Sequence, residues 1–484
     1  MGVVIRQSIQ NTLSTYLGFG LGAVNTLFLY TRILTVETYG LLSILLSVAT
    51  LLMPVFVFGL PNTLIKFFST EETTKERALL NGFSLWFPLV FIVPTTLIII
   101  FFNLEIAQSL TEKNAFVAPY VWHILFIGIS MAYFEIGYAQ ARVVLKSAWG
   151  NFLKEVSHRM LITFLLLLLY FKFLDLSLFF YLLVGVYVIR AILMYVYVFR
   201  QCGHCFLIGI PRNIKTYLHY SLYMFIGGTA AVVILEIDKI MIYTYVNIEQ
   251  VAFYTVAVFM ATIVGVPARS MYQITAPLTA RLIQDGDFEG LKKLYKQSSL
   301  HLGMVSGGVL LLLMVNLDQI YRLIPQAYGG TSLLVMLIGL SKFYDALLGN
   351  NNAILFNSPY FKSILKFGLF LAAMTVVLNY LFIPIFGIRG AAFASFLSVG
   401  LYDTAKIWYV KTKYHTQPFG RKTLYLLLIL AGVYGLAIFL PNLSNLYIDV
   451  AYKSVLISVL YVLLLYLTKT SEVLNGLIKK YTGF

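Results

Sequence analysis

The sequence is poor in charge. Only 11% of its 484 residues are Asp, Glu, Lys or Arg, whereas 60% are hydrophobic. A soluble domain carries about 25% charged residues, which cover the surface that it presents to water. One aqueous globular core is therefore excluded, and lipid must be the outer solvent of this chain.

The hydrophobic runs also lack the period-two alternation of a half-buried strand. A hydrocarbon core of about 30 Å is crossed by about 20 helical residues, and backbone groups in lipid must be satisfied within the segment or in a closed barrel. Continuous apolar runs of this length predict helices, so we expect an all-α polytopic membrane protein with about fourteen spans. The predicted spans are 8–33, 38–60, 81–103, 117–139, 156–173, 177–199, 219–243, 250–272, 298–316, 331–353, 364–385, 389–410, 423–440 and 451–468.

Cysteine is scarce. Cys202 and Cys205 are the only two, in the segment QCGHC with His204 between them. A redox dithiol needs a thioredoxin-like context, and a zinc site needs two further ligands. Neither is visible, so we interpret the pair as reduced and without a role.

Sequence signatures of enzymes are missing. The chain contains no GxxxxGK, no HExxH, no GxSxG and no cluster of carboxylates in an aqueous loop. The longest connections have about 20 to 25 residues, such as 273–297, which leaves no room for a soluble catalytic domain. We therefore predict that the protein is not an enzyme and holds no metal or cofactor. An enzyme of polysaccharide assembly within the membrane stays as an alternative, although it would need a larger outer loop.

Basic residues are distributed unevenly over the connections. When the spans are assigned alternately to the two sides, one side carries 25 Lys and Arg, Lys406 among them, and the other carries 7, including Lys453. Arg190, Arg269 and Lys342 fall inside spans and complete the total of 35. The positive-inside rule then predicts that both termini are cytoplasmic. The net charge of +15 needs only anionic lipid to explain it, so nucleic acid is not expected as a partner.

Two basic residues are predicted at the centres of spans, where a charge costs at least about 2.5 to 3.5 kcal/mol. Arg190 lies near the midpoint of 177–199, among apolar and aromatic neighbours, and Lys342 lies at the midpoint of 331–353. Asp345 follows Lys342 by three residues and so shares its helical face, where the two could neutralise each other. We predict that Arg190 and Lys342 bind an anion, and the alternative for each is a buried ion pair that fixes helix packing.

Further charges lie nearer the ends of spans. Arg32, Lys239 and Arg269 are secondary candidates for anion binding, and each could instead extend its charge to the membrane interface. Asp238 is a candidate for ion coupling, and Glu135 is a candidate counter-ion that could equally be structural.

Five segments carry a resemblance to a known family. They are LSTYLGFGLGAVNTLFLYTRILTVETYGLLSILLS with FVFGLPNTLIKFFS, ARVVLKSAWGNFLKEVSHR, LEIDKIMIYTYVNIEQVAFYTVA, APLTARLIQDGDFEGLKKLYKQSS, and LNYLFIPIFGIRGAAFASFLSVG. In this order they resemble the oligosaccharide flippases of polysaccharide biosynthesis, in the superfamily that also contains multidrug and toxin extrusion (MATE) transporters and the lipid II flippase. Within the fourth segment, QDGDFEGLKKLYKQ predicts an amphipathic helix on the inner surface that couples two spans.

The resemblance implies two pseudo-symmetric lobes of six helices with the substrate site near the midplane. We expect the lobes at residues 1–200 and 212–411, followed at 412–484 by two additional spans and a cytoplasmic tail. It also implies a bacterial cytoplasmic-membrane location and a substrate, an undecaprenyl-pyrophosphate-linked oligosaccharide of O-antigen, capsule or exopolysaccharide, which is moved from the inner to the outer leaflet. Polysaccharide polymerase and chain-length proteins are further candidate partners.

We expect alternating access in which Arg190 and Lys342, one per lobe, hold the pyrophosphate, with Arg32, Lys239 and Arg269 as secondary cations. An Na⁺ or H⁺ gradient could drive the cycle through Asp238 or Asp345. The alternatives are an exporter of drugs or other lipids from the same superfamily, and a structural membrane protein in which Arg190 and Lys342 have no role in transport.

Overall fold

The computed structural model describes residues 2–69, 71, 73–102, 117–144, 146–202, 206–360 and 362–470. Within these ranges the secondary structure consists of helices joined by short turns, with no strand. Cys205 and the predicted tail beyond Thr470 lie outside them. The chain forms two compact units, Met1–Ala252 and Phe253–Phe484, here called unit 1 and unit 2.

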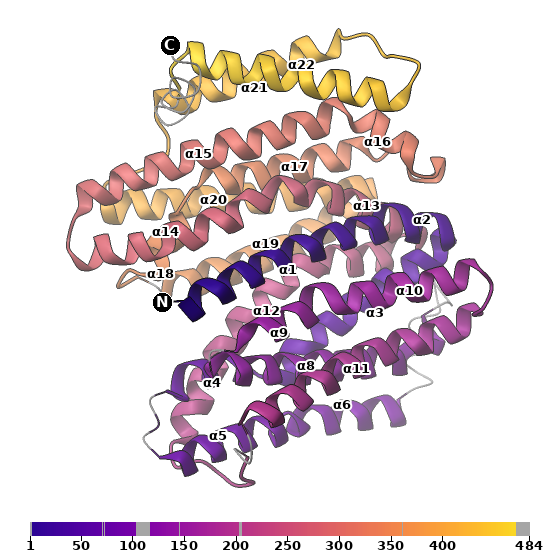
Figure 1. Ribbon diagram of the computed structural model, residues 1–484, viewed down its shortest axis with the longest axis vertical. Coiled ribbons are helices and arrows are strands. Elements are labelled where there is room, and N and C mark those ends of the chain that lie inside the picture. Colours follow the sequence, from indigo (N-terminus) through magenta and orange to yellow (C-terminus); the bar gives the residue numbers. More distant parts are fainter. Residues whose placement is uncertain are drawn as a thin grey trace. The chain divides into compact units, whose positions relative to one another are not determined.

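Unit 1 is a bundle in which α3, α8 and α11 lie side by side, and α12 packs on α3 and α4 (Figure 1). Its buried apolar residues include Phe56, Leu80, Leu125 and Tyr217. Its helices are α1 (Gly2–Ala23), the π-helix η1 (Val24–Leu29), α2 (Tyr30–Ile33), α3 (Val36–Val57), α4 (Leu60–Phe67), α5 (Thr74–Trp86), α6 (Leu89–Phe101), η2 (Ala118–Tyr120), α8 (Val121–Val143), α9 (Ser147–Phe152), the π-helix η3 (Leu153–Ser157), α10 (His158–Tyr170), α11 (Leu176–Cys202) and α12 (Ile214–Tyr245).

Unit 2 contains α21 and α22, shown in yellow in Figure 1, and both pack on α15. Met304, Leu311, Leu426, Val433 and Ile457 form the buried core of this packing. The helix α13 (Glu249–Thr262) crosses the boundary between the units. It is followed by η4 (Ile263–Gly265), α14 (Val266–Gln284), α15 (Phe288–Val315), α16 (Leu317–Leu323), η5 (Gln326–Tyr328), α17 (Ser332–Leu347), α18 (Asn351–Phe356), α19 (Lys362–Phe386), α20 (Ile388–Tyr414), α21 (Arg421–Ile438) and α22 (Leu446–Leu467).

Ten of the described helices are long and apolar enough to cross a membrane. The other four expected spans also fall on helices, namely α10, α12, α17 and α20. Of these, α17 has only 16 residues and α10 has 13. The all-α polytopic fold is therefore confirmed, and fourteen spans are consistent with it.

The boundary between the compact units differs from the expected boundary between lobes at residues 200–212. It lies after Ala252, because α12 packs on α3 and α4 and so belongs to unit 1. The two pseudo-symmetric six-helix lobes stay a prediction. The last two helices, α21 and α22, belong to unit 2.

The predicted surface helix in QDGDFEGLKKLYKQ is wrong. The segment contains the turn of a helical hairpin, because α14 runs on to Gln284 and α15 begins at Phe288. Gly286 has φ +70° in this turn, a conformation that glycine adopts without steric cost. The side chain of Asp287 accepts a hydrogen bond from the Gly290 N–H at 2.8 Å and so caps the start of α15.

Candidate functional site

Arg190 lies in the interior of unit 1. Its side chain extends from α11, and its guanidinium carbon lies 4.4 Å from the ring centre of Phe134 and 4.9 Å from that of Tyr187. The residue is only 7% exposed. No described carboxylate lies within ion-pair distance, and Nε has no hydrogen-bond partner among the described residues. Arg190 is thus held by cation–π contacts. It does not form the buried ion pair that the sequence analysis gave as the alternative to anion binding.

Glu135, the predicted counter-ion, pairs with a different cation. The Nζ of Lys154 in η3 lies 2.6 Å from Oε1 of Glu135 on α8. Both side chains are partly exposed. The pair links α8 to the segment before α10, which favours the structural reading of Glu135.

Lys239 is also paired. Its Nζ lies 2.7 Å from Oε2 of Glu236, three residues earlier on α12. The same oxygen accepts a hydrogen bond at 2.6 Å from the hydroxyl of Ser47 on α3. This arrangement compensates the charge of Lys239 and fixes α12 on α3. Of the two other candidates in unit 1, Asp238 is buried and Arg32 is exposed at the end of α2.

In unit 2, Lys342 and Asp345 do not form the ion pair that their spacing allowed. Lys342 is half-buried on α17, and Gly265 of η4 lies near its side chain. Asp345 is exposed, and its Oδ1 lies 3.9 Å from the Nζ of Lys406 on α20. Packing of α20 on α17 therefore gives Asp345 a partner from another helix, and Lys342 has no carboxylate within ion-pair distance in the described part of the chain.

The sequence analysis did not predict the buried ion pair of Asp403 and Lys406. Lys406 Nζ lies 2.9 Å from Oδ1 of Asp403, 3.2 Å from Oδ1 of Asn352 and 4.1 Å from the ring centre of Tyr402. Asp403 is fully buried and Lys406 is 1% exposed. Lys406 had been counted with the connections of the inner side, although both residues fall within the predicted span 389–410. Their spacing of three residues inside one span was a signal that could have identified them.

Arg269 is exposed on α14, two residues after Pro267. The 3-10 turn η4 and this proline in the first turn of α14 mark the change from α13 to α14. No ion pair of the described residues includes Arg269. Together with Lys342, it gives unit 2 two cations, within or near the spans, that have no carboxylate within ion-pair distance among the described residues.

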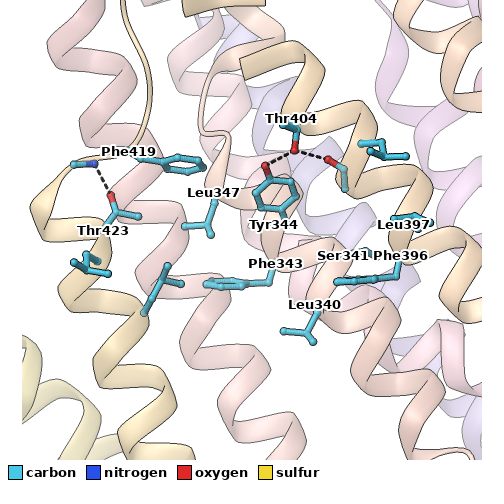
Figure 2. A pocket seen from close by; sticks show the side chains of 15 residues that line it. Leu340, Ser341, Phe343, Tyr344, Leu347, Phe396, Leu397, Thr404, Phe419 and Thr423 are labelled. Atoms are coloured by element: carbon cyan, nitrogen blue, oxygen red, sulfur yellow. Dashed lines mark hydrogen bonds between the residues drawn. The ribbon is translucent and has the colours of Figure 1, made fainter. Parts of the chain in front are cut away.

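An open groove in unit 2, here called the apolar groove, lies between α17, α20 and the start of α21 (Figure 2). Its volume is about 660 Å³, and it is lined by apolar side chains such as Phe343, Leu347, Leu401 and Leu424, with no charged residue. The hydroxyl of Thr404 donates to the Gly400 carbonyl at 2.7 Å and bonds to Tyr344 Oη at 2.9 Å. Because these polar groups are satisfied within the protein, the groove suits a hydrocarbon chain.

Residues 4–283, more than half of the chain, match the family model described as "Polysaccharide biosynthesis protein". No curated protein matches the sequence significantly.

Among solved structures, the fold is similar to the lipid II flippase MurJ in an inward closed conformation, with a TM-score of 0.73 and 15% identity over 96% of this chain and 100% of MurJ. An inward-facing multidrug resistance MATE family transporter of the MOP superfamily gives a TM-score of 0.65 at 13% identity, covering 85% of this chain and 98% of that one. A MOP superfamily transporter from Pyrococcus furiosus gives 0.53 at 15% identity, covering 86% and 93%.

At these identities the structural matches show the fold alone, and the match to the family model identifies the family. The chain belongs to the polysaccharide biosynthesis protein family.

Proposed function

We propose that the protein is a flippase that moves an undecaprenyl-pyrophosphate-linked oligosaccharide repeat unit from the inner to the outer leaflet of a bacterial cytoplasmic membrane. The observation that carries the proposal is the combination, within unit 2, of an apolar groove with two cations in or near spans that are in no described ion pair. A lipid-linked glycan needs both, because it joins a long hydrocarbon chain to a doubly charged headgroup. The family description supports the link to polysaccharide assembly.

The headgroup sets the main energetic problem. Sugar hydroxyls and pyrophosphate lose their hydration in bare lipid, which costs several kcal/mol for each unsatisfied polar group. Lys342 and Arg269 would replace part of that hydration by charge-assisted hydrogen bonds to the phosphates. Arg190, which the sequence predicted to act with Lys342, has little exposed surface and is the weaker candidate for direct contact. Lys239 is the weakest of the basic candidates, because Glu236 already compensates its charge.

Transport would proceed by alternating access, with an ion gradient as the driving force. Asp345 is a candidate for the coupling group, since it is exposed and lies 3.9 Å from a lysine on a neighbouring helix. Protonation of Asp345, or Na⁺ binding to it, would weaken this contact between α17 and α20. Asp238, buried on α12, is the corresponding candidate in unit 1. Polysaccharide polymerase and chain-length proteins would act on the product.

The experiment is a flipping assay with purified protein in liposomes that contain fluorescent undecaprenyl-pyrophosphate oligosaccharide. Wild-type protein should expose the label to an external quencher faster than empty liposomes do, and Lys342→Gln should lower the rate about tenfold or more. Lys366→Gln, which removes an exposed lysine of α19, should leave the rate unchanged. A wild-type rate equal to that of empty liposomes contradicts the proposal, and transport of cationic drugs in its place supports the exporter alternative.

A further inference from the structure

A second pocket in unit 2 is strongly basic. It has a volume of about 330 Å³ and lies between the first half of α15 and the start of α21, with Thr470 beyond the end of α22. Lys293, Lys296, Arg421 and Lys422 line it, and none of the described residues that line it is a carboxylate. We call it the basic pocket.

Three of the four cations take part in no ion pair among the described residues. These three, Lys293, Lys296 and Arg421, are also exposed. The neighbouring Lys292, by contrast, lies 3.4 Å from Glu289 and outside the lining. Three positive charges converge on one small cavity, which favours an anion as its occupant.

The start of α21 adds to this field. The helix has 18 residues and begins at Arg421, so the positive end of its dipole lies at the pocket. The Thr423 hydroxyl accepts a hydrogen bond from the Gly420 N–H at 3.2 Å, which holds the first turn in place. An anion with several oxygens, such as a phosphate, can accept hydrogen bonds from several of the lysine and arginine side chains at the same time.

The pocket lies at the level of a membrane interface, because α21 begins beside it and α22 ends beside it. Gly420 and Thr423 line both the basic pocket and the apolar groove. A ligand with a phosphate headgroup and an apolar chain could therefore occupy both, whereas a free phosphate would use only one. This adjacency selects a lipid over a soluble anion.

We propose that the basic pocket binds the phosphate headgroup of a bulk anionic phospholipid of the membrane, whose hydrocarbon chain lies in the apolar groove. The polyprenyl carrier of the proposed function shares this chemistry, and the test distinguishes the two.

The test measures lipid retention by the full-length purified protein with native mass spectrometry. The probes are phosphatidylglycerol, polyprenyl monophosphate, zwitterionic phosphatidylcholine and inorganic phosphate. The site variant combines K293Q, K296Q and R421Q, and the matched control combines K362Q, K366Q and K411Q, which removes the same charge from exposed positions on α19 and α20.

Wild-type protein should retain an anionic lipid in preference to phosphatidylcholine. The site variant should bind that lipid about tenfold or more weakly, because it lacks three basic residues and each of them attracts the anionic headgroup. The control should stay within about twofold of wild type. Preference for phosphatidylglycerol over the polyprenyl phosphate supports the proposal, and preference for the polyprenyl phosphate overturns it in favour of the carrier.

Equal loss of lipid in the site variant and the control would overturn the proposal, because the attraction would then be a property of the whole basic face. Retention of wild-type affinity by the site variant would overturn it as well, and so would inorganic phosphate binding as tightly as the lipid. The measurement is made without transport, so its failure is distinct from a failure of the flippase proposal.

Discussion

On α20, the Nζ of Lys406 lies 2.9 Å from Oδ1 of Asp403, and both side chains are almost completely buried. A buried ion pair loses so much hydration that its net contribution to stability is small, whereas removal of one partner leaves an uncompensated charge. The pair therefore adds little to the stability of the fold, but a substitution of either residue alone is poorly tolerated.

We expect Asp403→Leu and Lys406→Met each to destabilise the protein by about 3–5 kcal/mol, and the double variant to be close to wild type. The measurement is a double-mutant cycle of thermal unfolding on purified protein in detergent. Arg281→Gln serves as control, because its partner Asp285 and Arg281 itself are exposed, and such pairs contribute little. Additive effects of the two single substitutions would show that the charges do not compensate each other.

Replacing Arg190 by Met should leave the unfolding temperature unchanged or raise it. The guanidinium is buried with no carboxylate within ion-pair distance among the described residues. Its contacts with Phe134 and Tyr187 return about 2 kcal/mol each, whereas desolvation of a charge costs several kcal/mol. Measuring unfolding and flipping on the same preparation distinguishes a role of Arg190 in transport from a role in packing. A stable variant that has lost transport supports a role in function, and a clear loss of stability would show that Arg190 is needed for packing.

Gly59→Ala should destabilise unit 1 by more than about 2 kcal/mol. Gly59 has φ +71° between α3 and α4, and an added Cβ would lie 2.2 Å from the carbonyl oxygen of Ser221 on α12. Gly228→Ala on α12 is the matched control, since nothing lies within 4 Å of its Cβ position and alanine favours a helix. In chemical unfolding, the free energy of unfolding should fall for Gly59→Ala and should rise or stay unchanged for Gly228→Ala. An equal fall in both variants would contradict this account.

Asp449→Asn should loosen the connection between α21 and α22. One carboxylate oxygen of Asp449 accepts the Leu443 N–H at 3.0 Å, and the other accepts Gln319 Nε2 and lies 3.1 Å from Lys453 Nζ. Loss of the negative charge leaves Lys453 buried and uncompensated, at a cost of about 3–5 kcal/mol.

Limited proteolysis of residues 441–445 is the measurement, and faster cleavage in Asp449→Asn is the expected result. The control is Asp318→Asn, which neutralises an exposed carboxylate at the start of α16. Cleavage at the wild-type rate in Asp449→Asn would mean that the carboxylate does not hold the connection.

Much of the architecture could be predicted from local patterns. Runs of apolar residues fixed the helical, multi-pass character, because the length of a span and the need to satisfy its backbone are local properties. The turn at Asp285–Asp287 was not recognised, since its flanking polar residues read as a surface helix when in fact they extend α14 and α15.

The roles of the individual charges could be predicted only where both partners share a helix. The i,i+3 pair of Asp403 and Lys406 was visible in principle within the predicted span 389–410. The contacts of Glu135 with Lys154, and of Asp345 with Lys406, join different helices, so no spacing in the sequence indicates them.

The sequence by itself thus determined that the chain is a helical membrane protein with a strong charge asymmetry, because hydrophobic length and charge placement act segment by segment. Only the tertiary structure decided which cations are compensated and which are not, and that an apolar groove and a basic pocket meet at the start of α21. The physical reason is that ion pairs and cavities depend on distances of a few ångströms between helices, which packing sets.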